Sequence, residues 1–222
     1  MGAILIQPAH AGGYTFSVSR RALLIRNPAS AGGRSQERRL AQFLERLRAQ
    51  GVDTEVQSTA RPGHALELAR DRAGEFRAVI AAGGDGTVHE VASGLVASGY
   101  DTPLAIAPFG TGNDIAQLAG IRDDDAAVSA TVQPRPIALD TIEVSWTEDG
   151  RRQRRHALLF GGTAFASELL RQTTPGVIRF FGPRLCYSVG FFRALGTFRA
   201  PTLTVRTESG EWTQPNGVLA LA

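Results

Sequence analysis

The residues best suited to chemistry form the stretch Gly83-Gly84-Asp85-Gly86-Thr87-Val88-His89-Glu90-Val91. The apolar run 78–82 precedes it and predicts a buried strand, and apolar residues at spacings of three and four follow it and predict a helix. A strand, a glycine turn and a helix start together point backbone N–H groups at an anion such as phosphate. The glycines would allow a ligand to approach closely and would permit positive φ angles.

A second glycine turn, Pro108-Phe109-Gly110-Thr111-Gly112-Asn113-Asp114, follows an apolar strand at 104–107. Two further loops, 27–33 and 59–64, follow strands at 22–26 and 54–58 and precede helices at 36–50 and 65–73. Strands that alternate with helices predict a parallel sheet. Ligands of such sheets bind outside the carboxyl ends of the strands. We therefore expect the four loops to converge on one site.

Composition excludes several classes of protein. All 24 basic residues are arginine, so P-loop proteins, protein kinases and pyridoxal-phosphate enzymes, which need a specific lysine, are excluded. The single cysteine, Cys186, allows neither an internal disulfide nor a cysteine zinc site. The small net charge of +3 and the lack of a recognition motif predict no nucleic-acid partner. No apolar run is long enough to predict a transmembrane helix.

The pattern changes after about residue 125. Residues 141–146 alternate, Asp149-Gly150 predicts a hairpin, and 155–160 would be the return strand. A helix is predicted at 185–195, and strands at 203–206 and 218–221 flank a Ser209-Gly210 turn. The fold class is therefore α/β: an extension at 1–20, a parallel-sheet nucleotide-binding domain at 21–135, and an incomplete antiparallel β-rich second domain at 136–222. Because the sequence ends within an apolar run, we expect the last strand to lack a partner.

Four motifs in register resemble the diacylglycerol kinase catalytic domain family, which includes bacterial lipid kinases, sphingosine kinases and ceramide kinases. The likeness is strong over 21–135 and looser over 136–222. In the later part, Phe160-x-Gly162-x-x-Phe165 and Cys186-Tyr187 look like the opening of that family's second domain. The four motifs are Asn27-Pro28-x-Ser30-x-Gly32-Gly33, Thr59 with Gly63-His64-Ala65, Gly83-Gly84-Asp85-Gly86-Thr87-x-x-Glu90-Val91, and Pro108-x-Gly110-Thr111-Gly112-Asn113-Asp114.

The resemblance implies a lipid kinase that uses ATP and Mg²⁺ and transfers the γ-phosphate of ATP to a diacylglycerol-like hydroxyl at a membrane surface. Asp85 would be catalytic, near the phosphates, Mg²⁺ and the attacking hydroxyl. The resemblance assigns no individual metal ligands. We expect a cytoplasmic protein that contacts the inner membrane face peripherally. The residues implied in nucleotide binding are Asn27, Thr59, Gly84, Asp85, Gly86, Thr87, Val88, His89, Glu90, Thr111 and Asn113.

Two other functions stay open. An NAD-kinase-like enzyme would share the Gly-Gly-Asp-Gly-Thr motif, although the Asn27 loop and the Thr111 turn favour a lipid kinase. A catalytically silent nucleotide- or lipid-binding protein is the second alternative, because the family's C-terminal stretch does not follow Ala222 and His89 replaces a common asparagine. We expect the 222-residue chain to bind nucleotide and to transfer phosphate slowly or not at all.

Each candidate residue also has a purely structural interpretation. Asp85 could cap the helix that follows it, and Glu90 could be a first-turn acid favoured by the helix dipole. Thr59 and Thr111 could bond within their own loops.

Three charged or aromatic groups outside the motifs have a structural interpretation as well. The acids 123–125 are more typical of a solvated turn than of a metal site. The arginine run 151–155 is more typical of a solvated surface than of a membrane contact. The phenylalanines 180, 181, 191 and 192 lie among arginines and are interpreted as core, with contact at a membrane interface as the alternative.

Overall fold

The computed structural model describes residues 4–5, 21–28, 33–134, 137–139, 141–148, 150–158, 162–207 and 210–221. The chain divides into two compact units, Met1–Leu159 and Phe160–Ala222. By this division the antiparallel strands near residue 150 belong to the first unit. The domain boundary near residue 135 stays a prediction.

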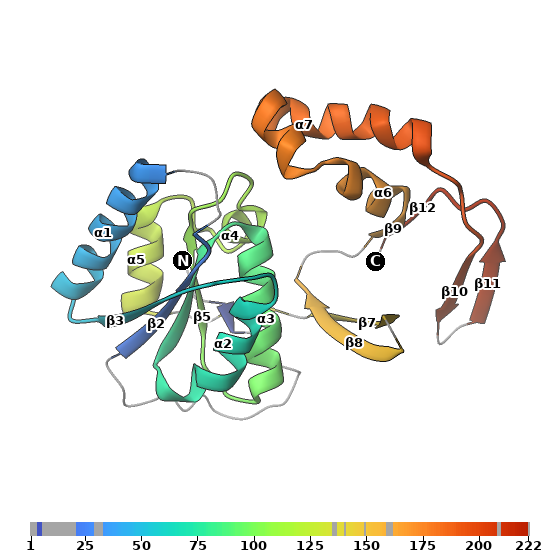
Figure 1. The fold of residues 1–222 in the computed structure, drawn as a ribbon. Helices are drawn as coiled ribbons and strands as arrows, with labels where there is room; N and C mark the ends of the chain where they lie inside the picture. Colours follow the sequence, from blue (N-terminus) through green and yellow to red (C-terminus); the bar gives the residue numbers. More distant parts are fainter. Residues whose placement is uncertain are drawn as a thin grey trace. The chain divides into compact units, whose positions relative to one another are not determined.

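The first unit is built on a six-stranded sheet with the order β3-β2-β4-β5-β1-β6 (Figure 1). The four strands β3, β2, β4 and β5 are parallel, which confirms the predicted α/β class. Every residue of β4 and β5 is buried, as expected for strands covered on both faces. The strands are β1 (Ile4–Leu5), β2 (Arg21–Arg26), β3 (Asp53–Ser58), β4 (Ala78–Gly83), β5 (Leu104–Pro108) and β6 (Ile137–Ala138).

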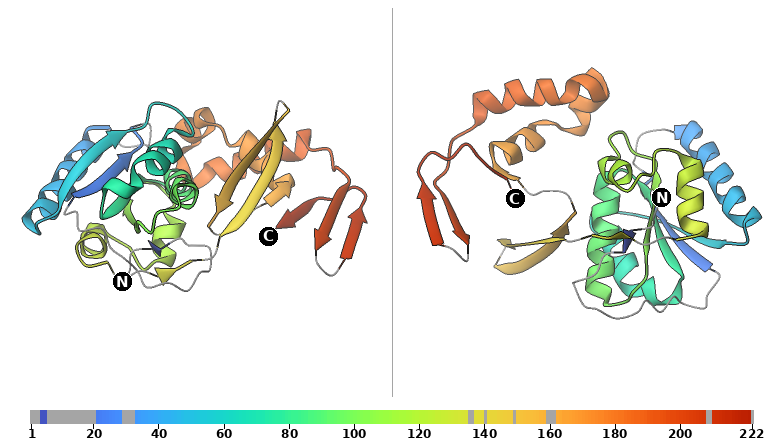
Figure 2. Two further views of the ribbon diagram at one scale, coloured as in Figure 1. Left: turned by 90° about the horizontal axis from the view of Figure 1, so that it is seen from below. Right: turned by 180° about the vertical axis from the view of Figure 1, so that it is seen from behind.

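Helices cover both faces of this sheet (Figures 1 and 2). One face carries α1 and α5, and the other carries α2 and α3. The amphipathic helix predicted at 36–50 is confirmed, since α1 buries Leu40, Phe43 and Leu47. The helical elements are α1 (Gly33–Ala49), α2 (His64–Arg72), the 3₁₀ turn η1 (Ala73–Glu75), α3 (Asp85–Ser98), α4 (Asp114–Leu118) and α5 (Asp124–Val132).

Helix α5 was not predicted, and it corrects the interpretation of the three acids at 123–125 as a solvated turn. Asp123 is the N-cap, and its Oδ1 accepts a hydrogen bond from Ala126 N–H at 2.8 Å. Asp124 forms a two-pronged ion pair with Arg39 of α1, and Asp125 pairs with Arg46. The acids therefore start α5 and fasten it to α1.

The predicted hairpin around residue 150 is present. Strands β7 (Ile142–Glu148) and β8 (Arg151–Ala157) pair antiparallel, and Gly150 has φ 73°. Ser93 attaches the hairpin to α3, because its Oγ accepts a hydrogen bond from His156 N–H at 3.1 Å and donates one to His156 O at 3.3 Å.

Two of our predictions about strand pairing in the second unit were wrong. The last strand does have a partner, since β12 pairs antiparallel with β9. Strand β10 pairs with β11, so the strands predicted at 203–206 and 218–221 are not partners. The elements are β9 (Gly162–Ala164), α6 (Phe165–Gln172), α7 (Pro175–Thr197), β10 (Leu203–Thr207), β11 (Gly210–Gln214) and β12 (Leu219–Leu221).

Helix α7 is much longer than the predicted helix at 185–195. Thr174 caps its start by accepting a hydrogen bond from Val177 N–H, and Gly182, with φ 75°, interrupts it. Within the described ranges, no helix is long and apolar enough to cross a bilayer.

Candidate functional site

The loops that follow β2, β3, β4 and β5 leave the same edge of the sheet (Figure 1). The parallel register places the carboxyl ends of these strands level with one another. Backbone bonds join the loops, because Thr59 N–H donates to Arg26 O at 2.9 Å and Phe109 N–H donates to Gly83 O at 3.1 Å. The expected convergence is confirmed for the described part of these loops. Residues 29–32 of the Asn27 loop lie outside the described residues.

The two glycine turns touch at Gly84 and Gly110. A Cβ on Gly110 would stand 2.2 Å from Gly84 Cα, so Gly110 has no room for a side chain, whereas a Cβ on Gly84 would make a tight contact of 3.3 Å with Gly110 Cα. A Cβ on Gly83 would stand 2.5 Å from Thr87 Oγ1. None of Gly83, Gly84 and Gly86 has a positive φ, so of the two reasons given for glycine in this turn the freedom to adopt positive φ is not used. Close packing explains Gly83 and Gly84. A Cβ on Gly86 would meet nothing within 4 Å, so this glycine leaves open space beside the turn.

Asp85 links the two turns through its side chain. Its Oδ1 accepts a hydrogen bond from Ile115 N–H, in the first turn of α4, at 3.1 Å. The N-cap residue of α4, Asn113, makes no side-chain cap bond. Asp85 therefore caps a neighbouring helix and not, as one structural interpretation held, its own.

Asn113 holds the second turn in shape. It adopts a left-handed backbone with φ 56°, which asparagine tolerates better than most residues. Its Oδ1 accepts from Gly110 N–H and its Nδ2 donates to Gly110 O, both at 2.9 Å. Thr111 lies exposed at the tip of this turn. The side chain of Asn113 is thus engaged inside the loop, and Thr111 is the one that faces outward.

The start of α3 offers two backbone donors. Thr87 and Val88 both direct their N–H groups to Gly84 O, at 2.9 and 3.2 Å. Asp85 and Gly86 are the first two residues of α3, so no carbonyl of the helix precedes them to accept their N–H groups. The N-cap Gly84 makes no side-chain cap bond. The N–H groups of Asp85 and Gly86 therefore suit an anion, whereas the Val88 side chain is 2% exposed and belongs to the core.

Glu90 ties α3 to the loop that follows β3. Its Oε1 accepts from Gly63 N–H at 2.9 Å, and its Oε2 accepts from Ala65 N–H at 3.2 Å. Gly63 is the N-cap of α2 and Ala65 lies in its first turn, and the N-cap glycine has no side chain to accept from these N–H groups. His64 is a helix-start residue, as predicted, and its Nδ1 accepts from Ala60 N–H at 3.1 Å. Glu90 thus holds the Thr59 loop in place, a role that the sequence did not reveal.

His89 brings an unusual group close to Asp85. Its Nε2 is buried and has no hydrogen-bond partner among the described residues. Burial lowers the pKa of His89, and the negative charge of Asp85 partly offsets that shift. The imidazole is therefore neutral at pH 7.

A second carboxylate, Asp114, was missing from the predicted site residues although it stands in the quoted motif. A Cβ on Gly112 would lie 3.2 Å from Asp85 Oδ2 and 3.8 Å from Asp114 Oδ2, so both carboxylates flank this glycine. Mg²⁺ is often held by one or two carboxylates together with substrate phosphates. Within the described part of the chain, no group of three His, Cys, Asp or Glu could hold a metal. The pair fits Mg²⁺ only if phosphate oxygens complete the coordination.

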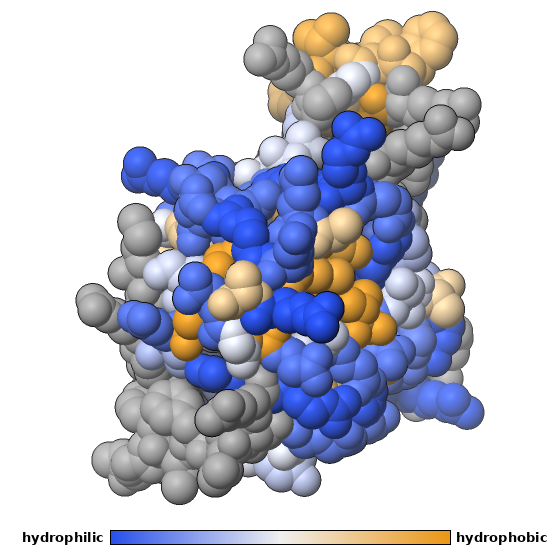
Figure 3. Space-filling model, turned by 90° about the vertical axis from the view of Figure 1, so that its left-hand side faces the viewer, coloured by the Kyte–Doolittle hydropathy of each residue, from blue (hydrophilic) through white to orange (hydrophobic). Residues whose placement is uncertain are grey.

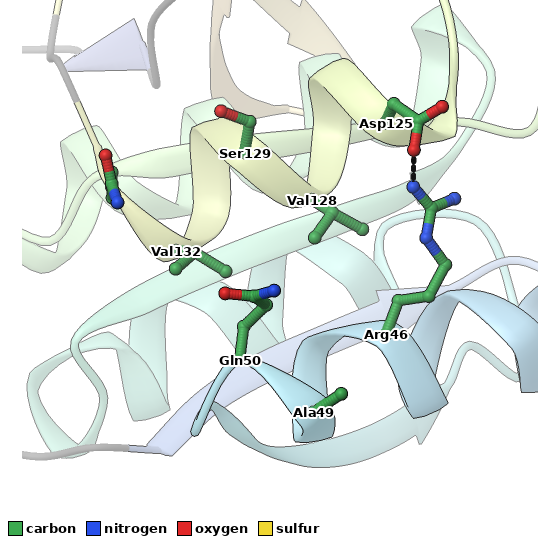
Figure 4. A pocket seen from close by; sticks show the side chains of 8 residues that line it. Arg46, Ala49, Gln50, Asp125, Val128, Ser129 and Val132 are labelled. Carbon is green, nitrogen blue, oxygen red and sulfur yellow. Dashed lines mark ion pairs between the residues drawn. The ribbon is translucent and has the colours of Figure 1, made fainter.

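Two large cavities open on the described part of the first unit, besides a small one of about 20 Å³ that Asn27 and Phe109 help to line. One of about 380 Å³ lies beside the Thr111 turn and is lined by Arg39, Gly110, Asn113 and Arg122, among others. The other, of about 360 Å³, lies between α1 and α5, with Val128, Val132 and the Arg46–Asp125 ion pair in its wall (Figure 4). Figure 3 views the molecule from the α1 side, where hydrophilic residues surround a smaller apolar area. The predicted site residue Asn113 lines the first cavity, and no predicted site residue lines the second.

Comparison with known proteins agrees with this geometry. The sequence pattern of the diacylglycerol kinase catalytic domain matches residues 21–144, which contain all four loops. The chain belongs to this family. A diacylglycerol kinase of Bacillus subtilis (strain 168) is 38% identical over 112 residues, which are 50% of this chain and 37% of that relative. A probable lipid kinase YegS-like of Yersinia enterocolitica is 29% identical over 194 residues, which are 86% of this chain and 62% of that relative.

Solved structures support the fold of this family member. A diacylglycerol kinase from Bacillus anthracis superposes with a TM-score of 0.60 at 22% identity, over 92% of this chain and 64% of that one. Such low identity establishes the fold alone. The chain spans less than two thirds of the length of these proteins.

Proposed function

We propose that this protein is a lipid kinase that uses ATP and Mg²⁺ and phosphorylates the hydroxyl of a diacylglycerol-like lipid at the cytoplasmic face of a membrane. Family membership supports the reaction class. The observation that carries the proposal is the hydrogen bond from Ile115 N–H to Asp85 Oδ1, because it fastens together the two turns whose groups suit a phosphate and a cation.

The nucleotide phosphates would lie at the start of α3, against the N–H groups of Asp85 and Gly86. Asn27, Thr59 and Thr111 follow the neighbouring strands and would border the nucleotide. Asp85 and Asp114 would hold Mg²⁺, which neutralises charge on the transferred phosphoryl group.

In the reaction, the lipid hydroxyl oxygen forms a bond to the γ-phosphorus while the bond from that phosphorus to the bridging oxygen breaks and ADP leaves. Asp85 would be catalytic because it places Mg²⁺ beside the transferred group, and the hydroxyl proton would pass to solvent. Positioning and charge neutralisation would supply the rest, and neither requires lysine.

The test is incubation of the chain with γ-labelled ATP, mixed lipid vesicles and NAD. We expect label in the organic phase, even at low turnover, and none from Asp85→Asn. Label in NADP would favour the NAD-kinase alternative, and a chain that labels no product and also fails to bind ATP would contradict the proposal.

A further inference from the structure

The cavity beside the Thr111 turn is lined by cations and has no part in the proposed reaction. Its volume of about 380 Å³ lies within the range of small-molecule sites. The residues that line it in the described structure include two arginines, Arg39 and Arg122, and no acid. Asp85 and Gly86, whose N–H groups would face the nucleotide phosphates, are not among them. The lining therefore suits an anion other than the nucleotide.

Arg39 has a fixed orientation in the wall of this cavity. Its Nε and Nη2 donate to the carboxylate of Asp124, at 2.9 and 2.7 Å. Its guanidinium also lies over the ring of Phe109, 4.6 Å from the centroid. Both contacts leave Nη1 without a hydrogen-bond partner among the described residues. A guanidinium that is already ordered loses little entropy when it binds a ligand.

Arg122 supplies a positive charge that forms no ion pair. In the described part of the chain its exposed side chain makes neither an ion pair nor a hydrogen bond. Asp124 offsets the charge of Arg39, so the excess positive charge of the cavity comes from Arg122. Hydrogen bonds to ionised groups are roughly twice as strong as bonds between neutral groups. Loss of Arg122 should therefore weaken the binding of an anion strongly.

The rest of the lining favours an anion that carries a hydroxyl and a short carbon chain. Gln117 Nε2 donates to Gly112 O at 2.9 Å, which leaves Oε1 as the free acceptor of this amide. An acceptor takes a hydrogen bond from a hydroxyl but not from a deprotonated phosphate oxygen. Pro108 and Ile121 are buried and offer apolar contact to carbon atoms.

We infer that this cavity binds a small phosphomonoester with a neighbouring hydroxyl, of which glycerol phosphate is a simple example. A phosphomonoester carries nearly two negative charges at pH 7 and three terminal oxygens, which match the donors of Arg39 and Arg122 better than a carboxylate does. The hydroxyl would donate to Gln117 Oε1. A soluble ester and the headgroup of a phosphorylated lipid present these same groups. This binding is separate from the proposed kinase reaction and requires no nucleotide.

The experiment is calorimetric titration of the 222-residue protein, without nucleotide, with glycerol phosphate, inorganic phosphate or a short-chain lysophosphatidate, which keeps one hydroxyl. We expect glycerol phosphate to bind more tightly than inorganic phosphate, because only the ester reaches Gln117. Arg122→Gln should lower the affinity for all three ligands at least about tenfold. Gln117→Leu should lower the affinity for glycerol phosphate about fivefold and leave that for inorganic phosphate unchanged.

Arg38→Gln is the matched control, because Arg38 is an exposed arginine of α1 that does not line the cavity. It should bind all three ligands as the wild type does. Arg122 is the better test position than Arg39, because its loss spares the ion pair between α1 and α5. Tighter binding of glycerol phosphate than of lysophosphatidate would assign a soluble ester, and the opposite order a lipid headgroup; both orders support the proposal.

Three results would overturn the proposal. They are no binding by the wild type, equal affinities of Arg122→Gln and Arg38→Gln, and displacement of glycerol phosphate by saturating ATP and Mg²⁺. Displacement would show that the cavity is part of the nucleotide site. Calorimetry with ATP on the wild type separates these results from a failure of the kinase proposal, which they leave standing as long as ATP binds.

Discussion

Asp85 can serve both the fold and a ligand because its two carboxylate oxygens face different partners. Oδ1 accepts the Ile115 N–H, whereas Oδ2 lies beside Gly112 near Asp114. The structural and functional interpretations of this residue are therefore compatible. The sequence located Asp85 through its motif, but the partner of its side chain comes from a turn thirty positions later. No local pattern predicts such a contact.

Substitutions at Gly110 and Gly86 distinguish two reasons for a glycine, which are close packing and ligand access. Gly110→Ala would push a Cβ into Gly84, and we expect unfolding stability to fall by about 1–3 kcal/mol. Gly86→Ala meets no atom within 4 Å and should leave stability unchanged or raise it by up to about 1 kcal/mol, while weakening ATP binding. Urea denaturation and ATP calorimetry of both variants test this. Equal losses of stability would show that close contact is not what requires glycine at 110.

Glu90 positions the Thr59 loop by capping α2. Glu90→Ala leaves Gly63 N–H and Ala65 N–H without their acceptor, and we expect a loss of about 1–2 kcal/mol in unfolding stability. Glu90→Gln keeps one acceptor oxygen and should recover part of that loss. Urea denaturation measures both effects. If Glu90→Ala were as stable as the wild type while ATP binding disappeared, Glu90 would be a direct ligand contact and not a positioning residue.

Among the elements, the buried parallel strands were the most predictable, because strands covered on both faces read as continuous apolar runs. Helix α5 escaped prediction because its acidic start resembles a turn, and its capping bond and its pairs with α1 are visible only in space. The start of α7 was missed because it contains prolines and glycines, although Pro175 stands in the first turn, where proline is tolerated.

Ser93 connects two elements that lie far apart in the sequence. It is 4% exposed and bonds to both backbone groups of His156. Ser93→Ala leaves a donor and an acceptor of β8 without these bonds, so we expect a loss of about 1–3 kcal/mol and faster hydrogen exchange at the His156 amide. Ser129→Ala, an exposed position on α5, is the control. Unchanged exchange at His156 would contradict the attachment of the hairpin through Ser93.

The ion pair between Glu55 of β3 and Arg72 at the end of α2 predicts that the stability of the fold decreases at acidic pH. The pKa of Glu55 is lowered from 4.5 to about 2, mainly by a hydrogen bond from Arg72 and to a smaller extent by one from Gln57. The charged form therefore stabilises the folded state fully above pH 4.5, and this contribution is lost as the pH falls toward about 2. Urea midpoints measured across this window should fall less steeply for Glu55→Gln than for the wild type. Parallel pH curves would show that Glu55 contributes nothing to acid sensitivity.

At the scale of the whole molecule, the sequence predicted the first unit far better than the second. The first unit consists of strands and helices that each carry a local pattern. The second depends on pairing between distant segments, since β12 joins β9 across more than fifty residues and β10 takes β11 as its partner. The exposed phenylalanines of α7 were interpreted as core because an apolar residue alone does not reveal whether a partner covers it.

The central claim is that the Asp85 turn holds ATP together with Mg²⁺. The direct measurement is calorimetric titration of the wild type and of Asp85→Asn with ATP, with and without Mg²⁺. Asparagine keeps an oxygen for the Ile115 N–H, so the fold is retained while the charge is lost. Asp53→Asn, exposed at the start of β3, is the control and should behave as the wild type.

For Asp85→Asn we predict an ATP affinity at least about tenfold lower, and no longer raised by Mg²⁺, since even a carboxylate that only orients a metal ligand is worth that much. An Asp85→Asn protein that binds ATP as tightly as the wild type, with the same dependence on Mg²⁺, would contradict the account.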